Sequence, residues 1–239
     1  MNSGLAKKLR EGTKKAHTMA ENVDFVKSFL KGVIAPESYR KLVAGLYFVY
    51  AEMEDQMHRH QEHPVVGPIY LPLLNRRNSL EKDLRFYYGE NWSDQIQISP
   101  ATQAYVDRIR EVSESEPELL ISHAYTRYMG DLSGGQILKG IAQRAMQLAD
   151  GCGTAFYEFD DIADGKAFKA MYRQKLDELP LDAAAIDGIV KEANAAFEMN
   201  MKLFQELEGN ALKSIGQLLL NTLTRRRAQT SPTLVATDS

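Results

Sequence analysis

The sequence predicts an all-α protein that forms one multi-helix domain. Apolar residues recur at helical spacing along most of the 239 residues, and no strong alternating apolar and polar segment is bounded by turn signals. No linker is long enough to divide the chain, and no segment is repeated. We therefore expect one domain over residues 1–225 and a flexible tail over 226–239, because the end of the chain is small, polar and contains a proline.

The N-terminal part of the chain predicts two helices. The first should begin after an N-cap at Asn2 or Ser3. Its inward face is made of Leu5, Leu9, Thr13, Ala16, Ala20 and Val23. The second should span 36–62, because Pro36 suits a first helical position and three prolines follow the end of the helix. Its inward residues are Leu42, Leu46, Val49, Tyr50, Met53 and Met57.

The middle of the chain predicts three further helices. Two short ones should lie over 79–88 and 100–112, the second with Ser99 as its N-cap. A long helix should begin at Pro117 and reach about residue 148. We expect it to bend at Gly130–Gly135, because bare backbone loosens the hydrogen-bond ladder there.

Two helices are expected in the C-terminal part. A short one over 165–176 precedes a long final helix, which starts after Pro180 and Asp182. The inward positions of the final helix are Ile186, Ile189, Ala193, Phe197, Asn200, Phe204, Leu207, Leu212 and Ile215.

Charge and composition exclude several classes of protein. With 29 Lys and Arg against 32 Asp and Glu, the formal net charge is −3, so no global field favours nucleic acid or an anionic membrane. The N-terminus lacks the apolar core of a signal peptide, and the longest apolar run, about 42–51, is too short to span a bilayer. The single cysteine, Cys152, excludes an intrachain disulfide and fits a reducing compartment. We expect a soluble intracellular protein, with a monomer as the default state.

Three glycines and a carboxylate lie inside the helix predicted from Pro117. Gly130, Gly134 and Gly135 each cost roughly 0.5–1 kcal/mol relative to alanine in a helix interior. Gly130 and Gly134 share one helix face and leave a strip of backbone without Cβ atoms. The strip predicts a flat ligand, a tight helix crossing or a flexible bend, and spacing alone does not choose between them. Asp131 beside it would bind water or a polar side chain, or cap the bend.

His17 is the candidate ligand of the first helix. Thr13, His17 and Glu21 continue one ladder of i, i+4 positions, so the imidazole should project near the core with a carboxylate one turn away. A lone histidine at such a position is usually structural, and spacing alone favours that role.

The other histidines and acids make poor metal sites. His58 and His60 point apart on a helix, and His63 immediately precedes Pro64, where the helix must end. A di-iron carboxylate centre needs two Glu-x-x-His motifs, and only Asp55-x-x-His58 approaches one.

Four segments, in one order, are distinctive. They are Ala16-His17-Thr18-Met19-Ala20-Glu21-Asn22, Glu116-Pro117-Glu118-Leu119-Leu120, the segment from Ala124 to Gln136, and Phe197-Glu198-Met199-Asn200-Met201-Lys202-Leu203-Phe204. On these segments the chain resembles haem oxygenases of the soluble cyanobacterial or plastid type, over nearly all of residues 5–225. The resemblance implies that haem b lies between a proximal N-terminal helix and a glycine-bent distal helix.

The resemblance also implies a role for each site residue. His17 would be the proximal ligand of the haem iron, oriented by Glu21. Gly130 and Gly134 would lie over the other haem face and leave room for O2, while Asp131 would hold the water that delivers protons. The implied partners of the haem propionates are Arg10, Tyr125, Lys169 and Arg173. The implied pocket walls are Phe197 and Phe204, and the implied members of the water network are Tyr50, Arg127 and Asn200.

Two departures from the family pattern keep the chemistry. Arg10 stands where some relatives have lysine, and it retains the charge while adding a fork that can grip a carboxylate. Met129 stands where many relatives have leucine, which is close to it in volume.

The implied activity is oxidation of haem at the α-meso carbon to biliverdin IXα, carbon monoxide and ferrous iron, with O2 and electrons from reduced ferredoxin. A basic patch near the N-terminus would then dock acidic ferredoxin, or it is a solvated helix face. The patch comprises Lys7, Lys8, Arg10, Lys14 and Lys15. We expect no membrane anchor, a cyanobacterial cytosolic or plastid stromal location, and a bilin reductase of phycobilin biosynthesis as a possible downstream partner. The competing interpretation is a haem carrier of the same fold, which has no need of Asp131 or of an open distal face.

Overall fold

The computed structural model describes residues 4–229, with side chains described for residues 4–208. Nine α-helices make up most of this part of the chain, and it contains no strand, so the predicted all-α class is confirmed. The helices are α1 (Leu5–Gly12), α2 (Lys14–Glu21), α3 (Asp24–Leu30), α4 (Pro36–Arg59), α5 (Arg77–Tyr88), α6 (Pro100–Ser115), α7 (Leu120–Met146), α8 (Gly165–Asp177) and α9 (Ala183–Gln229).

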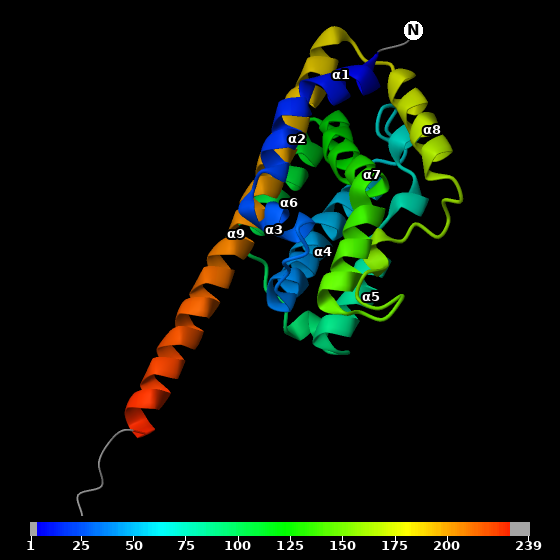
Figure 1. Cartoon of the computed structure of the whole chain (residues 1–239). Coiled ribbons are helices and arrows are strands. Elements are labelled where there is room, and N and C mark those ends of the chain that lie inside the picture. Colours follow the sequence, from blue (N-terminus) through cyan, green and yellow to red (C-terminus); the bar gives the residue numbers. More distant parts are fainter. Residues whose placement is uncertain (1–3, 230–239) are drawn as a thin grey trace, which may run out of the picture.

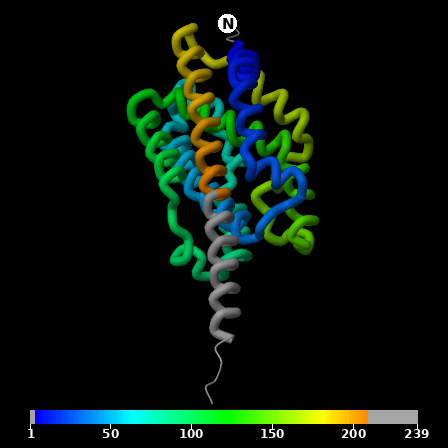
Figure 2. Tube along the Cα trace, turned by 60° about the vertical axis from the view of Figure 1, so that its left-hand side comes forward, coloured from blue at the N-terminus to red at the C-terminus, as the bar shows by residue number. Residues whose placement is uncertain are grey.

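Helix α9 is the element against which most of the others pack. In Figure 1 it runs the length of the molecule, with α1 and α2 along its first half and α7 on the other side of the bundle. Figure 2 shows α9 between α1–α3 on one side and α6 on the other. It contacts α1, α2, α3, α4, α6 and α7. The position of α9 therefore sets the positions of both the N-terminal helices and α7.

The predicted apolar stripes form the core. All six inward residues predicted for 36–62 are buried on α4, and Leu5, Leu9 and Ala16 are buried on α1 and α2. Two helices have a side-chain N-cap, which accepts hydrogen bonds from backbone N–H groups of the first turn that have no partner within the helix. Ser99 accepts a hydrogen bond from the Thr102 N–H at 3.3 Å at the start of α6, as predicted. Asp164 accepts from two amides at the start of α8, a cap that the sequence reading did not name.

The first predicted helix is two helices, so this prediction was wrong in detail. The break falls at Thr13, whose φ of −98° and ψ of −1° depart from helical values. Beside the break, a Cβ atom on Gly12 would lie 2.5 Å from Val190 Cγ1, so only glycine lets α1 approach α9 this closely. The N-cap of α1 is Gly4, with φ +64°, and not Asn2 or Ser3, which lie outside the described residues.

Helix α3 was not predicted. Its seven residues hold too few turns for a clear apolar period, and it is stabilised by tertiary contacts, since Phe29 is buried and Phe25 packs on the core. Helix α4 ends at Arg59, three residues before the predicted end, because His60 leaves the helical region. The ring of His63 then accepts hydrogen bonds from two amides of the turn that follows.

Helix α7 remains helical through its glycines. It begins at Leu120, because Pro117–Leu119 forms a separate 3₁₀ turn, and it ends at Met146, before Gln147 with φ +53°. The helix is therefore continuous through Gly130–Gly135, the segment at which a bend is predicted.

Several predictions for the end of the chain concern residues that the structure does not describe. Helix α9 continues to Gln229, and residues 230–239 of the predicted tail lie outside the described residues. Leu212 and Ile215, predicted to point inward, lie outside the described side chains. Across the helices described from residue 4 to 229, none combines the length and the apolar character needed to cross a membrane.

Candidate functional site

Helix α7 presents a strip of bare backbone on one face. A Cβ atom added at Gly130 or at Gly134 would meet no heavy atom within 4 Å, whereas one added at Gly135 would lie 3.4 Å from Tyr157 Cδ1. Gly130 and Gly134 therefore face open space, and a tight helix crossing does not explain them. Gly135 instead packs against the 3₁₀ turn η5 (Ala155–Tyr157) behind the helix.

Asp131 lies beside the strip in a buried polar cluster. Its Oδ2 accepts a hydrogen bond from the Tyr50 hydroxyl, and its Oδ1 lies 3.9 Å from Nη2 of Arg127. Arg127 donates from Nε to the Tyr50 hydroxyl at 3.0 Å and from Nη1 to Asn200 Oδ1 at 2.5 Å. These four residues, here called the Asp131 cluster, join α4, α7 and α9. The structure thus brings together all four residues that the sequence assigned to proton delivery.

Burial governs the protonation of the Asp131 cluster. Burial raises the pKa of Asp131, and the charge of Arg127 and the hydrogen bond from Tyr50 oppose the rise. Burial also raises the pKa of Tyr50 well above its usual value, so the phenol keeps its proton and donates it in a hydrogen bond. Burial alone would lower the pKa of Arg127, but Tyr50 and Asp131 raise it. Burial therefore disfavours the charged form of Asp131, and Arg127 and Tyr50 favour it.

His17 lies on an exposed face of α2. Its side chain and that of Glu21 are each 57% exposed, and its Nδ1 lies 3.6 Å from Oε1 of Glu21. The ring also meets Phe197 of α9 edge-on, with centroids 5.7 Å apart. The predicted ladder with Glu21 is confirmed, and the imidazole lies at the edge of the core. With Nδ1 directed to Glu21, Nε2 has no partner among residues 4–208 and remains able to ligate a metal.

One turn of α9 links the two faces of the site. Phe197 contacts His17 on α2, and Asn200, three residues later, binds Arg127 on α7. The imidazole and the glycine strip therefore flank the same stretch of α9.

Basic residues gather beside the strip. Burial raises the pKa of Tyr125 on α7, and the nearby charges of Arg173 on α8 and Arg10 on α1 oppose that rise. Lys169 on α8 places its Nζ 3.3 Å from both the Leu132 carbonyl and the Ser133 hydroxyl of α7. The resemblance predicted that four residues bind the carboxylates of one ligand. They lie on α1, α7 and α8, on one side of α7, where they could pair with such carboxylates.

Aromatic residues line the α9 side of the site. Phe204 stacks on Phe25 of α3, with ring centroids 5.9 Å apart and planes 15° from parallel. Phe25 was not predicted because α3 was not predicted. A recognisable signal was the pair Phe25 and Phe29, one turn apart after Asp24.

A second buried cluster lies behind the first and was also missed. His123 of α7 is fully buried, with Nε2 3.2 Å from Oε1 of Glu192 on α9. Arg108 of α6 forks onto the same carboxylate at 3.0 and 2.6 Å. Tyr105 of α6 is fully buried between this group and Asn200. His123 precedes Arg127 by four residues, a helical spacing that could have suggested a second tie from α7 to α9.

The histidines dismissed as metal ligands have structural partners. His58 Nδ1 lies 3.3 Å from the Tyr70 hydroxyl, and His60 Nε2 lies 2.9 Å from the Ser113 hydroxyl. Among the described residues, no group of three or more histidines, cysteines or acids could hold a metal ion. His17 on its own could supply one ligand to an iron that is already held by another group.

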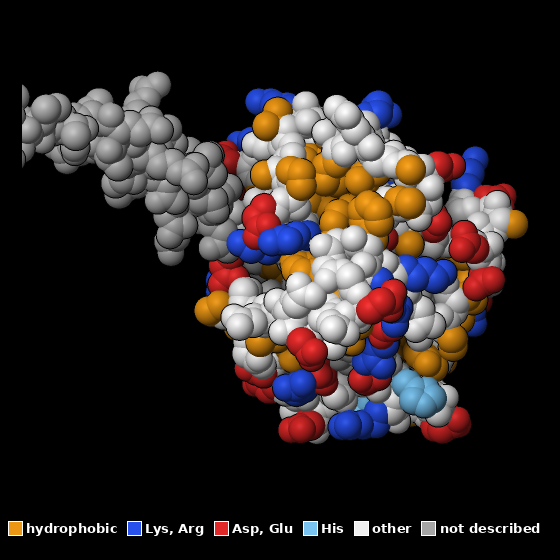
Figure 3. All heavy atoms as spheres, turned by 90° about the horizontal axis from the view of Figure 1, so that it is seen from below, with side chains coloured by type: hydrophobic (Ala, Val, Ile, Leu, Met, Phe, Trp, Pro, Cys, Tyr) orange, Lys and Arg blue, Asp and Glu red, His pale blue; other side chains and the backbone are white. Residues whose placement is uncertain are grey.

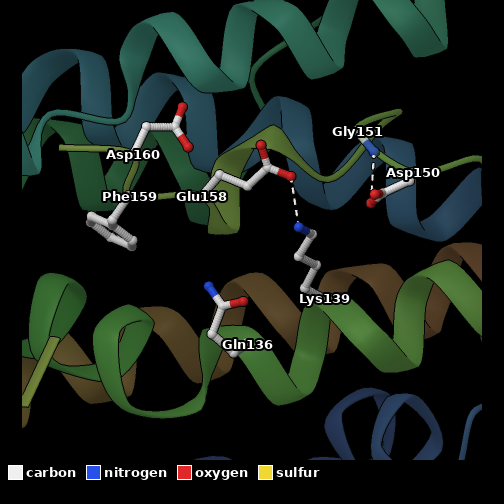
Figure 4. Close-up of a pocket in the computed structure, with 7 residues that line it drawn as sticks. All are labelled: Gln136, Lys139, Asp150, Gly151, Glu158, Phe159 and Asp160. Carbon is white, nitrogen blue, oxygen red and sulfur yellow. Dashed lines mark hydrogen bonds and ion pairs between the residues drawn. The ribbon is translucent and has the colours of Figure 1, made fainter. Parts of the chain in front are cut away.

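A separate polar pocket of about 470 Å³ lies beside the second half of α7. Its lining residues are Gln136, Lys139, Asp150, Gly151, Glu158, Phe159 and Asp160. Figure 4 shows Lys139 reaching across from α7 to Glu158, with Nζ and Oε1 2.7 Å apart. On helical spacing, Gln136 and Lys139 point away from the face of Gly130 and Gly134. This pocket is therefore distinct from the face that the predicted site residues share.

The molecule carries apolar side chains on its surface. Figure 3 shows apolar side chains gathered on one face of the molecule, bordered by charged ones. Ile137, which follows Gly134 by three residues on the same face of α7, is 65% exposed. One exposed apolar side chain beside a bare strip, an imidazole and a group of cations fits a flat, mainly apolar ligand with anionic edge groups.

Known proteins of similar sequence and fold point the same way. The family model described as "Heme oxygenase" matches residues 3–206. The chain is 65% identical to "Heme oxygenase 1" of Nostoc sp. over 238 residues, which cover 100% of both chains. It is 62% identical to "Heme oxygenase 1" of Synechocystis sp., covering 97% of this chain and 96% of the relative. The crystal structure of heme oxygenase-1 from Synechocystis sp. in complex with heme has a TM-score of 0.86 to this structure, covering 92% of this chain and 99% of that one.

Proposed function

Because the chain belongs to the haem oxygenase family, we propose that it cleaves haem at the α-meso carbon to biliverdin IXα, carbon monoxide and ferrous iron. O2 would be the oxidant, and reduced ferredoxin would supply the electrons. The observation that supports this most is the pairing of an open glycine strip with the buried Asp131 cluster, across α9 from an exposed imidazole. A carrier that only stores haem would need neither the open strip nor a buried carboxylate beside it.

In this proposal haem is both substrate and cofactor, and its iron supplies the site at which O2 is activated. His17 would ligate the iron, and Glu21, whose Oε1 lies 3.6 Å from His17 Nδ1, would orient the ring. Gly130 and Gly134 would lie over the opposite face, where their lack of Cβ atoms would keep the space clear for O2. The aromatic rings of Phe197 and Phe204 pack on the apolar part of the macrocycle.

Positive charges hold the anionic edge of haem in this proposal. Arg10, Lys169 and Arg173, together with the Tyr125 hydroxyl, bind the propionates and so set which edge of the ring lies inward. A fixed orientation is needed because the three other meso carbons have similar chemistry.

Asp131 organises proton delivery in the proposed reaction. Tyr50 and Arg127 hold its carboxylate in one orientation, and Asn200 holds Arg127. The raised pKa of Asp131 suits a group that passes protons through water to the reacting oxygen. Among residues 130–135 there is no histidine or arginine, whose direct contact with the oxygen would favour O–O cleavage over attack on the ring.

The electron donor would dock on the basic patch. Lys7, Lys8, Arg10, Lys14 and Lys15 are all exposed on α1 and α2. The nearby haem-binding residues His17 and Arg10 belong to the same two helices, so a donor bound there would be close to the haem. In a phycobilin pathway, a bilin reductase would consume the product.

The direct test supplies haem, ferredoxin, its reductase and NADPH in air, and follows the absorption spectrum. We expect the haem band to disappear while biliverdin and chelatable ferrous iron appear in equal amounts. A stable haem band under these conditions would exclude the oxygenase and leave the haem carrier.

Replacing His17 tests the iron ligand. His17→Ala should lose the ferric haem spectrum of the native protein and regain it when imidazole is added. His58→Ala is the matched control, since His58 is also exposed but contacts Tyr70. An unchanged spectrum in His17→Ala would remove His17 as the ligand.

Replacing Asp131 tests proton delivery. Asp131→Ala should bind haem with nearly native affinity yet fail to open the ring or divert the reaction. A full yield of biliverdin from this variant would exclude the role of Asp131.

A further inference from the structure

The turn η5 supports the candidate site from behind. Its Phe156 ring meets the Tyr50 ring edge-on, with centroids 5.3 Å apart and planes at 77°. Its Tyr157 ring lies against Gly135 of α7. Both Phe156 and Tyr157 are buried. The turn therefore touches the residue that donates to Asp131 and the helix that carries the glycine strip.

Asp83 of α5 fixes this turn through its backbone. Its Oδ1 accepts the Ala155 N–H and its Oδ2 accepts the Phe156 N–H, both at 2.8 Å. Two oxygens on two consecutive amides define both the position and the tilt of the turn. Asp83 is only 1% exposed, and burial of a carboxylate is unfavourable even when backbone donors are present. Its burial raises its pKa to about 6.

Other contacts bind the same segment to its surroundings. The Tyr87 hydroxyl of α5 donates to the Gly153 carbonyl at 2.9 Å, and Gln136 of α7 donates to the Tyr157 carbonyl at 2.8 Å. Gly153 has φ +68°, and a Cβ atom there would lie 2.5 Å from the Tyr87 hydroxyl, so this close approach requires glycine. These contacts hold the two ends of the segment 153–157. Asp83 holds its centre.

We propose that Asp83 is a positioning residue for the ring-opening reaction: it seats η5 so that Phe156 fixes the Tyr50 ring, and Tyr50 then holds the Asp131 carboxylate. The effect on turnover rests on the proposed function. The effect on Tyr50 is independent of it, because every contact from Asp83 to Asp131 joins two residues of the protein.

The test replaces Asp83 with asparagine in the full chain. The amide keeps the size of the side chain but offers one acceptor in place of two, so one of the two backbone hydrogen bonds is lost. The first readout is the Tyr50 hydroxyl proton in the ¹H NMR spectrum of the haem-free protein, identified by its loss in Tyr50→Phe. We expect this resonance to shift upfield, or to disappear through exchange with water, in Asp83→Asn. A simple loss of stability at a distant site would not move it.

The second readout separates binding from chemistry. In Asp83→Asn we expect unchanged haem affinity, because Asp83 is remote from His17, and turnover about 10- to 100-fold lower, the usual effect of a misplaced catalytic group. Glu206→Gln is the matched control, since Glu206 of α9 also accepts a backbone N–H, that of Ala101, at 2.8 Å. Glutamine keeps one acceptor for that N–H, so the Tyr50 resonance and turnover should be unchanged in this variant.

A second variant covers the case in which Asp83→Asn does not fold. Phe156→Leu keeps an apolar side chain of similar size but removes the edge contact with Tyr50, and it should shift the same resonance and lower turnover. The proposal is overturned if the Tyr50 resonance stays at its native position in the folded variants, or if it shifts while an active enzyme keeps native turnover. If the native protein does not consume haem, the proposed function fails, and the Tyr50 resonance still decides whether Asp83 positions the cluster.

Discussion

Replacing Gly134 with alanine should stabilise the protein and impair its reaction. Alanine in a helix interior is more stable than glycine by roughly 0.5–1 kcal/mol. A Cβ atom at Gly134 would meet nothing within 4 Å, so no steric strain offsets this gain. For a domain of this size the gain corresponds to a rise of about 1–4 °C in Tm. The same methyl group would project into the space proposed for haem and O2, and turnover should fall by about tenfold or more.

Thermal unfolding of the haem-free protein measures the first effect, and haem titration with single-turnover ring opening measures the second. Gly188→Ala is the control, because a Cβ atom there would lie an unstrained 3.8 Å from Leu119 Cδ2, away from the site. It should raise Tm by a similar amount and leave turnover unchanged. If Gly134→Ala fails to raise Tm while Gly188→Ala does, the strip is not open. If Gly134→Ala raises Tm and keeps native haem binding and turnover, the ligand does not lie on the strip.

Three further predictions concern buried charge. Glu192→Ala should lower the free energy of unfolding by about 1–3 kcal/mol, because it leaves the buried His123 without its partner and removes the carboxylate on which Arg108 forks. Glu111→Ala removes an exposed partner of the same Arg108 and should change the free energy of unfolding by less than about 1 kcal/mol in urea titrations. Burial alone would raise the pKa of Glu192, but hydrogen bonds from His123 and Arg108 lower it to about 2. Because the folded pKa lies below the unfolded one, about 3 kcal/mol of stability present above pH 4.5 should be lost as the pH falls to 2. Urea titrations of Glu192→Gln at pH 6 and 2 should lack that loss. Glu54 behaves in the opposite sense: burial raises its pKa to about 7, so its contribution to stability should fall by about 3 kcal/mol as the pH rises from 4.5 to 7, and a Glu54→Gln variant with the native pH slope would refute this.

The long periodic elements were predictable because their local pattern and their burial agree. The stripe from Leu42 to Met57 is buried as expected on α4, and Ser99 caps α6 as expected. Helix α3 was not predictable from periodicity, because seven residues span two turns and its stability comes from contacts such as Phe25 on Phe204. The break at Thr13 has the same origin, since Gly12 must approach Val190 on a helix that is remote in sequence.

The residues of the site also divide into those that local spacing could predict and those that depend on contacts between distant segments. His17 and Glu21, and likewise Gly130 and Gly134, are close in sequence, so helical spacing placed each pair. Spacing could not decide whether the strip was open or packed, because that depends on which segments of the chain approach it. The Asp83 anchor of η5 joins residues 72 and 73 positions apart, and no local pattern announces a carboxylate that binds backbone amides.

The open strip determines where the rest of α7 must be held. Compared with two alanines, Gly130 and Gly134 together lower the stability of the helix by about 1–2 kcal/mol. A Cβ atom at either position would meet no heavy atom within 4 Å, so nothing packs on this face of the helix there. The helix is instead fixed from its other sides: Arg127 binds Asn200 on α9 before the strip, and Gly135 and Gln136 rest on Tyr157 behind it. Asp131 lies between these supports, so a small movement of either one would displace its carboxylate. The contacts behind α7 are therefore as important to the proposed reaction as the residues that face the ligand.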